Sequence, residues 1–598
     1  MKKMFLLGAL FAVGLGFTAC SEKDAVENGT GQIPSGDSYV NLAINLPIAP
    51  GATPTRANDV FDDGLAKEYS VKDATLILFE GTNPSTAVYS GNYALNLSWD
   101  KVGETTDQIT TTAQIVQKVN NRTAATNNFY AYVVLNKPAK LTDILTGATS
   151  SSTFSSLFGT TATLATTNLT ETVDGTTNYI PMTNAPLAKY SGGSSAPTDG
   201  SYSVLSVIDK DLIFATEAEA QSHAATAVFV ERMYAKATIT NGSGDKIKDS
   251  YGNEVNIGTT EDPVYVNFDI QGWTLDNTNK SSYFQRQLAE TFPSYTWYNY
   301  HSDHTSVTGN NVYRFAGFGE VASGKGYRIY WALDPNYDSY AASTFNLAET
   351  SSTFGAVGDA NPQYCYENTF DVANQKEQST TRALVKVQFN SGTTFYSIND
   401  DYKKFYTAET LKGKIIEFLM ADPTIFAAAG TSGLSTPTVA NSTIDLTETD
   451  LGQIKVGTTL TLGDASSHTL DCSSYATTIN NLFNVENPSK HIKKYDNGIS
   501  YYPILIKHFG NDGCYWASSE HLSTTSYADE GTAPVSRYLG RYGMVRNNWY
   551  SMNISKIMNL GSPTIPTPTT DDDDKVKSYI SVEINILSWA KRTQDVDL

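Results

Sequence analysis

The sequence predicts a mostly β protein with more than one domain, and three observations support this. The chain has 598 residues, which is more than one hydrophobic core usually serves. Hydrophobic residues make up 40% of it and aromatic residues 11%, so the material for burial is ample. The chain is rich in Thr, Ser, Asn, Tyr and Gly and is often interrupted by Gly, Asn-Gly and Pro. That composition favours strands and turns over long helices.

The charge balance excludes one class of partner. The chain carries 42 Lys and Arg against 62 Asp and Glu, a formal net charge of −20. A protein that wraps a phosphate backbone needs dense positive charge. We therefore expect no nucleic-acid partner.

The first twenty residues have the pattern of a secretory signal. Lys2 and Lys3 precede an apolar run over residues 4–15, which is too short for an ordinary spanning helix. Residues 15–20 are similar to the lipobox of bacterial lipoproteins, in which the cysteine thiol is alkylated by diacylglycerol. Cys20 is thus the predicted lipidation site and would attach the precursor to the outer membrane. A plain secretory signal with an incidental cysteine is the alternative.

Disulfides are not expected to organise the fold. Without Cys20, the chain keeps Cys365, Cys472 and Cys514, an odd number. Their spacing also lacks the density of a disulfide scaffold.

A strand is predicted over residues 40–48, because apolar residues alternate there and share one face. A Pro/Gly loop over residues 49–59 follows and carries Arg56, the first arginine of the chain. Pro and Gly keep such a loop extended and exposed, where proteases cut. We expect cleavage between Arg56 and Ala57, so that residues 21–56 form a propeptide with a removable strand. Its apolar face consists of Val40, Leu42, Ile44, Leu46 and Ile48.

A second strand of the same pattern is predicted near the other end, over residues 579–586. The preceding residues 561–575 are Pro-rich and then acidic, typical of a stiff, solvated linker. We therefore assign residues 563–598 to a linker followed by C-terminal donor strands. The predicted donor residues are Ile580, Val582, Ile584, Ile586 and, after a change of phase, Trp589.

The two strands look interchangeable. They match position by position, including Ile44-Asn45 against Ile584-Asn585, so either could fill the same groove. Loss of the first strand would expose an apolar floor and two unpaired strand edges, and a donor strand would restore both. Because donor and acceptor are different surfaces of identical subunits, the contact is head-to-tail and builds filaments.

Between these ends we expect an N-terminal β-sandwich domain over residues 57–226 and a C-terminal one over residues 227–562. A fresh strand begins at Ala227 and marks the boundary. Short helices are predicted over residues 141–145 and 411–426. Strands are predicted over residues 74–79, 128–136, 204–214, 227–239, 264–270, 326–332, 382–389, 501–509 and 544–557, and residues 107–120 are expected to be a strand that runs into a turn.

Catalytic and metal-binding motifs are weak, so we expect no enzyme, no cofactor and no metal. Residues 319–326 fit most of a phosphate-binding loop, yet Gly326 stands where Ser or Thr should hold Mg²⁺. Cys514 has only His521 after it, where a papain-like nucleophile needs a distant downstream histidine. Residues 301–304 place two histidines in a polar loop without a companion motif. The acidic run over residues 571–574 is better explained as solvated linker than as a calcium site.

Four stretches together resemble the fimbrillin family, the shaft subunits of Bacteroidales type V pili, and most closely the minor-fimbria shaft type. These are residues 15–20, 46–58, 544–561 and 579–598. The third is the most specific, with Asn548-Trp549-Tyr550 followed by Leu560-Gly561.

The resemblance implies two transthyretin-like β-sandwich domains with a few short helices and an exchangeable C-terminal strand. It also implies export as a lipoprotein, maturation by an arginine- or trypsin-like protease and polymerisation with the tail as donor. The partners would be other copies of the chain and the anchor and tip subunits of an extracellular fimbrium. The filament would serve adhesion and biofilm formation, through a ligand that the sequence does not identify.

Retention of both the removable strand and the tail points to a shaft subunit. Two alternatives stay open. One is a tip or accessory fimbrial adhesin. The other is a monomeric surface lipoprotein that binds glycans, with its C-terminal strand packed on its own domain.

Overall fold

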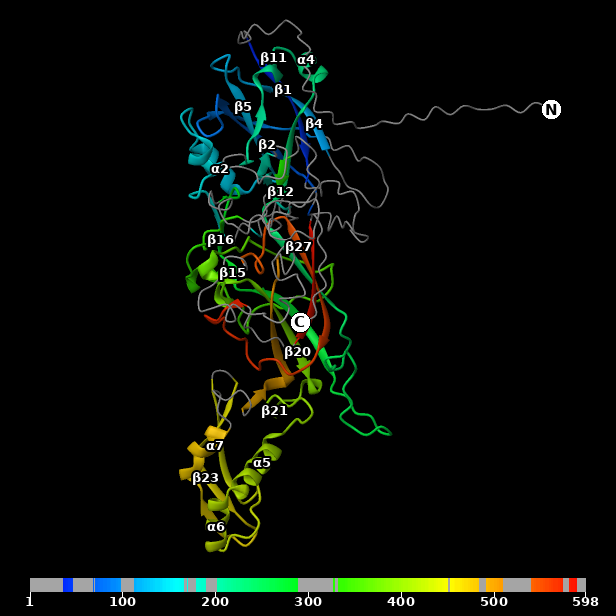
Figure 1. The fold of residues 1–598 in the computed structure, drawn as a ribbon, viewed down its shortest axis with the longest axis vertical. Helices are drawn as coiled ribbons and strands as arrows, with labels where there is room; N and C mark the ends of the chain where they lie inside the picture. Colours follow the sequence, from blue (N-terminus) through cyan, green and yellow to red (C-terminus); the bar gives the residue numbers. More distant parts are fainter. Residues whose placement is uncertain are drawn as a thin grey trace, which may run out of the picture.

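A computed structural model describes residues 36–46, 68, 70–97, 112–165, 169, 179–189, 202–288, 326–328, 332–449, 452–482, 491–508, 539–573 and 580–588. Along the long axis of the molecule lie an N-terminal sheet, a central pair of sheets and a small module of helices and strands (Figure 1). Strands dominate this part of the chain, so the mostly β prediction is confirmed.

The N-terminal part is built on a nine-stranded sheet whose main path runs β11-β1-β12-β7-β5-β2-β3, with β4 paired to β1 and β10 paired to β5. The predicted strands over 74–79 and 128–136 are confirmed as β2 and β5. The strands are β1 (Ser38–Asn45), β2 (Ala74–Gly81), β3 (Val88–Ala94), β4 (Thr112–Val119), β5 (Asn128–Leu135), β7 (Met182–Asn184), β10 (Ser206–Ile208), β11 (Ile213–Phe214) and β12 (Thr226–Arg232).

The sheet buries residues on both faces, as alternation along β5 shows. Phe129, Ala131 and Val133 join one apolar cluster, and Tyr130 and Tyr132 join another. The second cluster is covered by helices α2 (Ala139–Thr146) and α3 (Phe154–Phe158), which supply Leu141 and Phe158. The helix predicted over residues 141–145 is therefore present as α2.

The predicted strand over residues 227–239 is two strands in two different sheets. β12 ends at Arg232, and β13 (Ala235–Asn241) begins a new sheet after Met233 and Tyr234. The break lies beyond the boundary expected at residue 227. It was hidden in the sequence because both intervening residues are themselves buried and apolar.

Two sheets form the C-terminal sandwich. One has the order β19 (Gln363–Cys365), β13, β27 (Asn548–Ile557), β28 (Ile580–Ser588), and the other β14 (Phe268–Asp276), β20 (Arg382–Phe389), β26 (Ile499–Leu505). Ile239 and Met552 of the first sheet share a core with Val385 and Ile504 of the second. The strand predicted over residues 382–389 is confirmed as β20, whereas the one predicted over 264–270 begins four residues later and ends six residues later, as β14.

A separate module, called the insert module here, is inserted between β21 (Phe395–Ile398) and β25 (Ile492–Tyr495), which pair with each other. Its own core includes Leu411, Leu419 and Leu460. The helix predicted over residues 411–426 is split in two at Asp422, whose side chain accepts hydrogen bonds from the backbone of the helix that Pro423 begins. The module contains α5 (Ala408–Ala421), α6 (Pro423–Thr431), α7 (Ala476–Leu482), β22 (Thr443–Glu448), β23 (Ile454–Gly463) and β24 (Thr469–Asp471).

Short elements complete the described chain. Within it, no helix combines the length and apolar character needed to cross a bilayer. The short strands are β6 (Thr163–Ala165), β8 (Leu187–Lys189), β9 (Tyr202–Ser203), β15 (Thr278–Asn279), β16 (Ser281–Tyr283), β17 (Gly326–Arg328) and β18 (Phe345–Asn346), and the remaining α-helix is α4 (Glu217–Ser222). Turns of 3-10 helix lie at Lys210–Leu212, Ala342–Thr344, Val372–Asn374, Glu377–Ser379, Asn390–Gly392, Ser473–Tyr475 and Asp496–Gly498.

Candidate functional site: the first strand, its slot and the tail strand

Strand β1 is fixed in the N-terminal core by one face. The side chains of Val40, Leu42 and Ile44 are completely buried, and Leu46 is 6% exposed. They pack in the cluster that contains Leu76, Val133 and Val228. Full burial of an aliphatic side chain contributes about 1.5–3 kcal/mol, so this face of β1 is a main source of its attachment. We refer to the space that β1 fills as the β1 slot.

Both edges of β1 are paired. Along one edge, β4 pairs with it antiparallel over its whole length, from Ser38 opposite Val119 to Asn45 opposite Thr112. Along the other edge, β11 pairs antiparallel with Tyr39 and Val40, and β12 pairs parallel from Leu42 to Asn45. β1 is therefore an interior strand, and Figure 1 shows it between β4 and β12.

Asn41 fixes the other face of β1 through hydrogen bonds of its side-chain amide. Its side chain is 3% exposed, and its Nδ2 donates hydrogen bonds to the carbonyl oxygens of Ala220 (3.1 Å) and His223 (2.9 Å), at the end of α4. Its Oδ1 accepts a bond from Nε2 of Gln114 at 3.2 Å. A buried amide with all these partners fixes the register of a strand, because a shifted strand would leave them unpaired.

The tail strand β28 lies at the edge of the C-terminal sheet and pairs antiparallel with β27 of the same chain. In this register Ile580 lies opposite Ile557, Val582 opposite Ile554, Ile584 opposite Met552 and Ile586 opposite Tyr550. The structure thus places the two strands predicted to compete for one slot in two different sheets.

The segment before the tail strand is less solvated than the sequence predicts. Glu377 donates from its backbone N to the carbonyl oxygen of Asp571 at 2.9 Å, and the ammonium of Lys376 pairs with Asp572. The buried guanidinium of Arg382 donates to the carbonyl oxygen of Pro566. Asp573 is 2% exposed. The segment is therefore held by the 3-10 turn before β20 and by Arg382, the first residue of β20.

Downstream of the predicted cleavage position, Glu68 anchors the chain at the junction of the two parts. Its carboxylate lies 2.8 Å from Nζ of Lys236 and accepts a hydrogen bond from the hydroxyl of Tyr364. The Lys236 ammonium lies 3.6 Å from the ring centre of Trp549, a cation–π contact. Burial and the neighbouring Glu68 carboxylate raise the pKa of Tyr364 far above its usual range, which keeps its hydroxyl a donor. Nothing in the local sequence around Glu68 indicated this role.

Two further buried ion pairs join the sheets. Arg286 Nε lies 2.9 Å from a carboxylate oxygen of Glu231 on β12, and Arg546 Nε lies 3.2 Å from Glu367. Arg286 also donates to the carbonyl oxygen of Arg546 at 3.1 Å. Arginine suits such positions because its planar fork can serve several acceptors at once. The N-terminal sheet is thereby fastened to the chain that leads into β27.

Several predicted site residues lie outside the described residues. They are Cys20, Ile48, Arg56, Ala57 and Trp589, together with residues 301–304, Cys514 and His521. Of the predicted phosphate-loop segment, the described part is the strand β17 that begins at Gly326. Cys365 and Cys472 are free and buried, and burial raises the pKa of the Cys365 thiol to about 12.

Comparison with known families explains the C-terminal part. Residues 493–595, which include β26, β27 and β28, match the model described as major fimbrial subunit protein type IV, fimbrillin, C-terminal. The C-terminal region of the chain, residues 493–595, is thus a fimbrillin C-terminal region. The fimbrillin resemblance noted on residues 544–561 and 579–598 is thus confirmed. No curated protein sequence matches the chain.

Solved structures that resemble this chain include a candidate cell adhesion protein from Parabacteroides distasonis, with 10% identity, a TM-score of 0.33, and coverage of 93% of this chain and 98% of that one. A fimbrilin (fimA) from Porphyromonas gingivalis has 12% identity, a TM-score of 0.32, and coverage of 92% and 99%. The tip fimbrial protein Mfa3 from the same organism, with a C-terminal truncation, has 10% identity, a TM-score of 0.29, and coverage of 91% and 99%.

The family match indicates the general kind of function. The chain is a fimbrillin-like structural or adhesion protein, of a family whose place is the fimbrium at the cell surface.

Proposed function

We propose that this fimbrillin is the shaft subunit of a type V fimbria. It is exported as a lipoprotein anchored through Cys20, cleaved after Arg56 by an arginine- or trypsin-like protease and polymerised by donor-strand exchange. Each subunit receives the tail strand of a neighbour in the β1 slot, and anchor and tip subunits complete the filament. The filament serves adhesion and biofilm formation.

The observation that carries this proposal is the position of β1. It is an interior strand with both edges paired and one face fully buried, yet it precedes the loop that contains Arg56. Cleavage there would separate β1 covalently from every other strand of its sheet. Removal of β1 would then leave an apolar floor and two open edges, which only another strand of the same pattern could satisfy.

The register of the incoming strand follows from the side chains of β1. Aligning the apolar residues places Ile580, Val582, Ile584 and Ile586 where Val40, Leu42, Ile44 and Leu46 lie. The same alignment places Asn585 at the position of Asn45, whose Nδ2 donates to the carbonyl oxygen of Val228 at 3.4 Å. The donor would run in the direction of β1, antiparallel to β4.

At one position the tail strand and β1 differ in a way that matters. This difference supports the idea that polymerisation requires proteolysis. Ser581 falls where Asn41 lies, and a serine hydroxyl has one proton where the Asn41 amide donates two hydrogen bonds. The propeptide strand therefore fits the slot better than the tail strand does. In addition, β1 is tethered to its own sheet until the loop is cut. Both effects keep the precursor monomeric before cleavage.

The test uses the purified chain without residues 1–20, treated with trypsin and examined on a gel without boiling. The expected result is a ladder of polymers that appears only after cleavage at Arg56. The matched controls are Arg56→Ala, which removes the cleavage site, and deletion of residues 579–598, which removes the donor. Neither should form a ladder.

A second function competes with this one, a monomeric surface lipoprotein. The pairing of β28 with β27 in the same chain favours it, because the tail strand is already satisfied there. If the chain cleaved at Arg56 stays monomeric, the monomer is correct and the polymer is refuted.

A further inference from the structure

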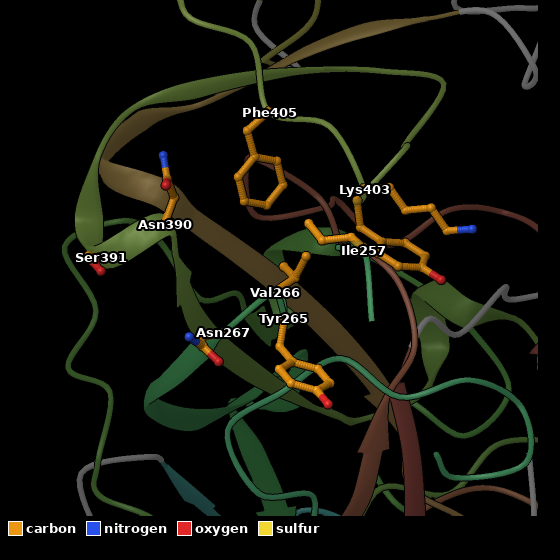
Figure 2. A pocket seen from close by; sticks show the side chains of 9 residues that line it. Ile257, Tyr265, Val266, Asn267, Asn390, Ser391, Lys403 and Phe405 are labelled. Carbon is orange, nitrogen blue, oxygen red and sulfur yellow. The ribbon is translucent and has the colours of Figure 1, made fainter. Parts of the chain in front are cut away.

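A pocket of about 230 Å³ opens on the C-terminal sandwich, next to the chain that leads into the insert module. Three segments form it: the approach to β14, the turn after β20 and the loop after β21. We call it the side pocket. Its floor consists of the apolar side chains of Ile257 and Val266 (Figure 2).

Aromatic rings form the walls of the side pocket. Figure 2 shows the rings of Phe405 and Tyr265 on opposite sides of Ile257 and Val266. Tyr402 is a third aromatic lining residue. Phe405 is held in place, because it stacks on Phe395 with ring centres 4.0 Å apart. Aromatic faces of this kind pack against the C–H face of a pyranose ring and still offer a hydroxyl where the residue is tyrosine.

Polar groups line the same space. Within the described residues, the amide of Asn267 and the hydroxyls of Tyr265 and Tyr402 form no hydrogen bond. On the opposite side of the floor from Lys403, Figure 2 shows Asn390, Ser391 and Asn267. Amide and hydroxyl groups can both donate and accept, which suits the hydroxyls of a sugar.

The turn that carries two of these groups is constrained. Asn390 and Ser391 have φ values of 52° and 50°, in the left-handed region. Asn is tolerated there, whereas Ser is uncommon, and such residues gather at ligand sites because the surrounding structure must hold them. The turn follows directly on β20, which is an interior strand of its sheet. The backbone that carries the polar groups is therefore attached to a strand that is paired on both edges.

We propose that the side pocket binds a single saccharide unit of a surface glycan. Its volume lies below the roughly 300–1,000 Å³ of pockets that hold drug-sized ligands, which suits one sugar ring rather than an oligosaccharide. The aromatic walls would take the apolar face of the ring, and Asn267, Asn390 and Ser391 its hydroxyls. The lining has no carboxylate, and Lys403 contributes a positive charge, so a sugar acid is accommodated as well as a neutral hexose.

The proposal goes beyond assembly, because it names a ligand class for the C-terminal sandwich that needs no strand exchange. It is therefore tested on the uncleaved monomer, the chain without residues 1–20 that carries Arg56→Ala. Saturation-transfer NMR would be recorded with the methyl glycosides of galactose, N-acetylglucosamine and N-acetylneuraminic acid. At least one should receive saturation from the protein, and its dissociation constant is then measured by titration.

Two variants locate the binding. Tyr402→Ala and Asn267→Ala should each weaken the bound sugar at least tenfold. The matched control is Tyr251→Ala, since that tyrosine is 89% exposed and lies outside the pocket. Thermal unfolding of every variant verifies that it folds. The proposal is overturned if none of the three glycosides receives saturation, or if both pocket variants bind as the control does. Polymer formation by the cleaved protein would be unaffected by either outcome.

Discussion

The ammonium group of Lys236 lies 2.8 Å from the carboxylate of Glu68, and both side chains are almost completely buried. Glu68 lies twelve positions after Arg56 and would be near the N-terminus if the proposed cleavage occurred there, whereas Lys236 lies on β13 of the C-terminal sheet. The pair therefore fastens the segment around Glu68 to the first strand of the C-terminal sheet.

Breaking this pair should cost much stability. Glu68→Ala leaves the Lys236 ammonium buried without its carboxylate, and such changes typically cost about 3–5 kcal/mol. Urea unfolding would measure the loss. Lys118→Ala is the control, because its ion pair with Asp37 is more than half exposed and should contribute little to stability. Equal losses in the two variants would contradict the anchoring role.

Removing the Asn41 amide should loosen β1. Asn41→Ala removes the Asn41 donor from the carbonyl oxygens of Ala220 and His223, and only Ala220 keeps a second donor, the backbone N of His223; the cost is about 1–3 kcal/mol. Hydrogen exchange should show faster exchange of the β1 backbone amides. Gln117→Ala on the neighbouring strand β4 loses only an exposed hydrogen bond and should leave that exchange unchanged. If the β1 amides of Asn41→Ala exchange as slowly as those of the parent chain, the Asn41 hydrogen bonds do not hold β1 in place.

A charge in the middle of the donor strand should abolish polymers. Ile584→Asp would place a carboxylate where Ile44 is fully buried, which the β1 slot cannot solvate. Ladders on unboiled gels after trypsin report the effect. Glu583→Lys changes charge at the neighbouring position, which the alternation assigns to the other face, and ladders should persist. Normal ladders from Ile584→Asp would remove the donor assignment, provided that circular dichroism shows a folded monomer.

Because of the Asp334 carboxyl, the free energy of unfolding should decrease as the pH rises from about 4 to about 7. Burial raises the pKa of this carboxyl to about 7, against the hydrogen bonds that it accepts from the backbone of Thr369 and Asn336 and from Asn279. The folded state therefore binds a proton that the unfolded state has already released, and this advantage is lost as the pH rises through 7. Urea midpoints at pH 5 and pH 7 measure the slope, and Asp334→Asn should flatten it. A variant with the slope of the parent chain would refute the assignment.

The insert module should be dispensable for assembly. Ile398 and Ile492 are opposite each other at the ends of β21 and β25, so an Asn-Gly turn in place of residues 399–491 closes a hairpin. The shortened chain should fold and form ladders after trypsin. It would also lack Tyr402 and Phe405, so sugar binding should be lost. Failure to form ladders in a folded variant would assign the module to assembly.

Local patterns predicted the elements that depend on neighbours in the sequence. The alternation over residues 382–389 gave β20 without error, and the alternation around Val40 located β1. The break at Asp422 and Pro423 is also readable, since these are a helix cap and the first residue of a helix. It was missed because the apolar pattern continues across it.

What the sequence could not predict depends on distant residues. Pro566 is fixed by Arg382, 184 positions away, and Glu68 by Lys236, 168 positions away. The composition of residues 561–573 therefore predicted a solvated linker, although hydrogen bonds and an ion pair hold this segment against the rest of the chain. The change of sheet between Arg232 and Ala235 is equally invisible, because both neighbouring residues are apolar and continue the strand pattern.

The placement of β1 inside its sheet and of β28 at the rim of another has a thermodynamic consequence. An edge strand has one hydrogen-bonded neighbour, whereas an interior strand has two. A tail strand that left β27 and entered the vacated slot of the next subunit would exchange one ladder for two. Growth of the filament would thus increase backbone pairing with every subunit added, and the reverse step would need two ladders to open together. Dissociation should accordingly be much slower than addition, so the polymer would persist after free subunits are gone.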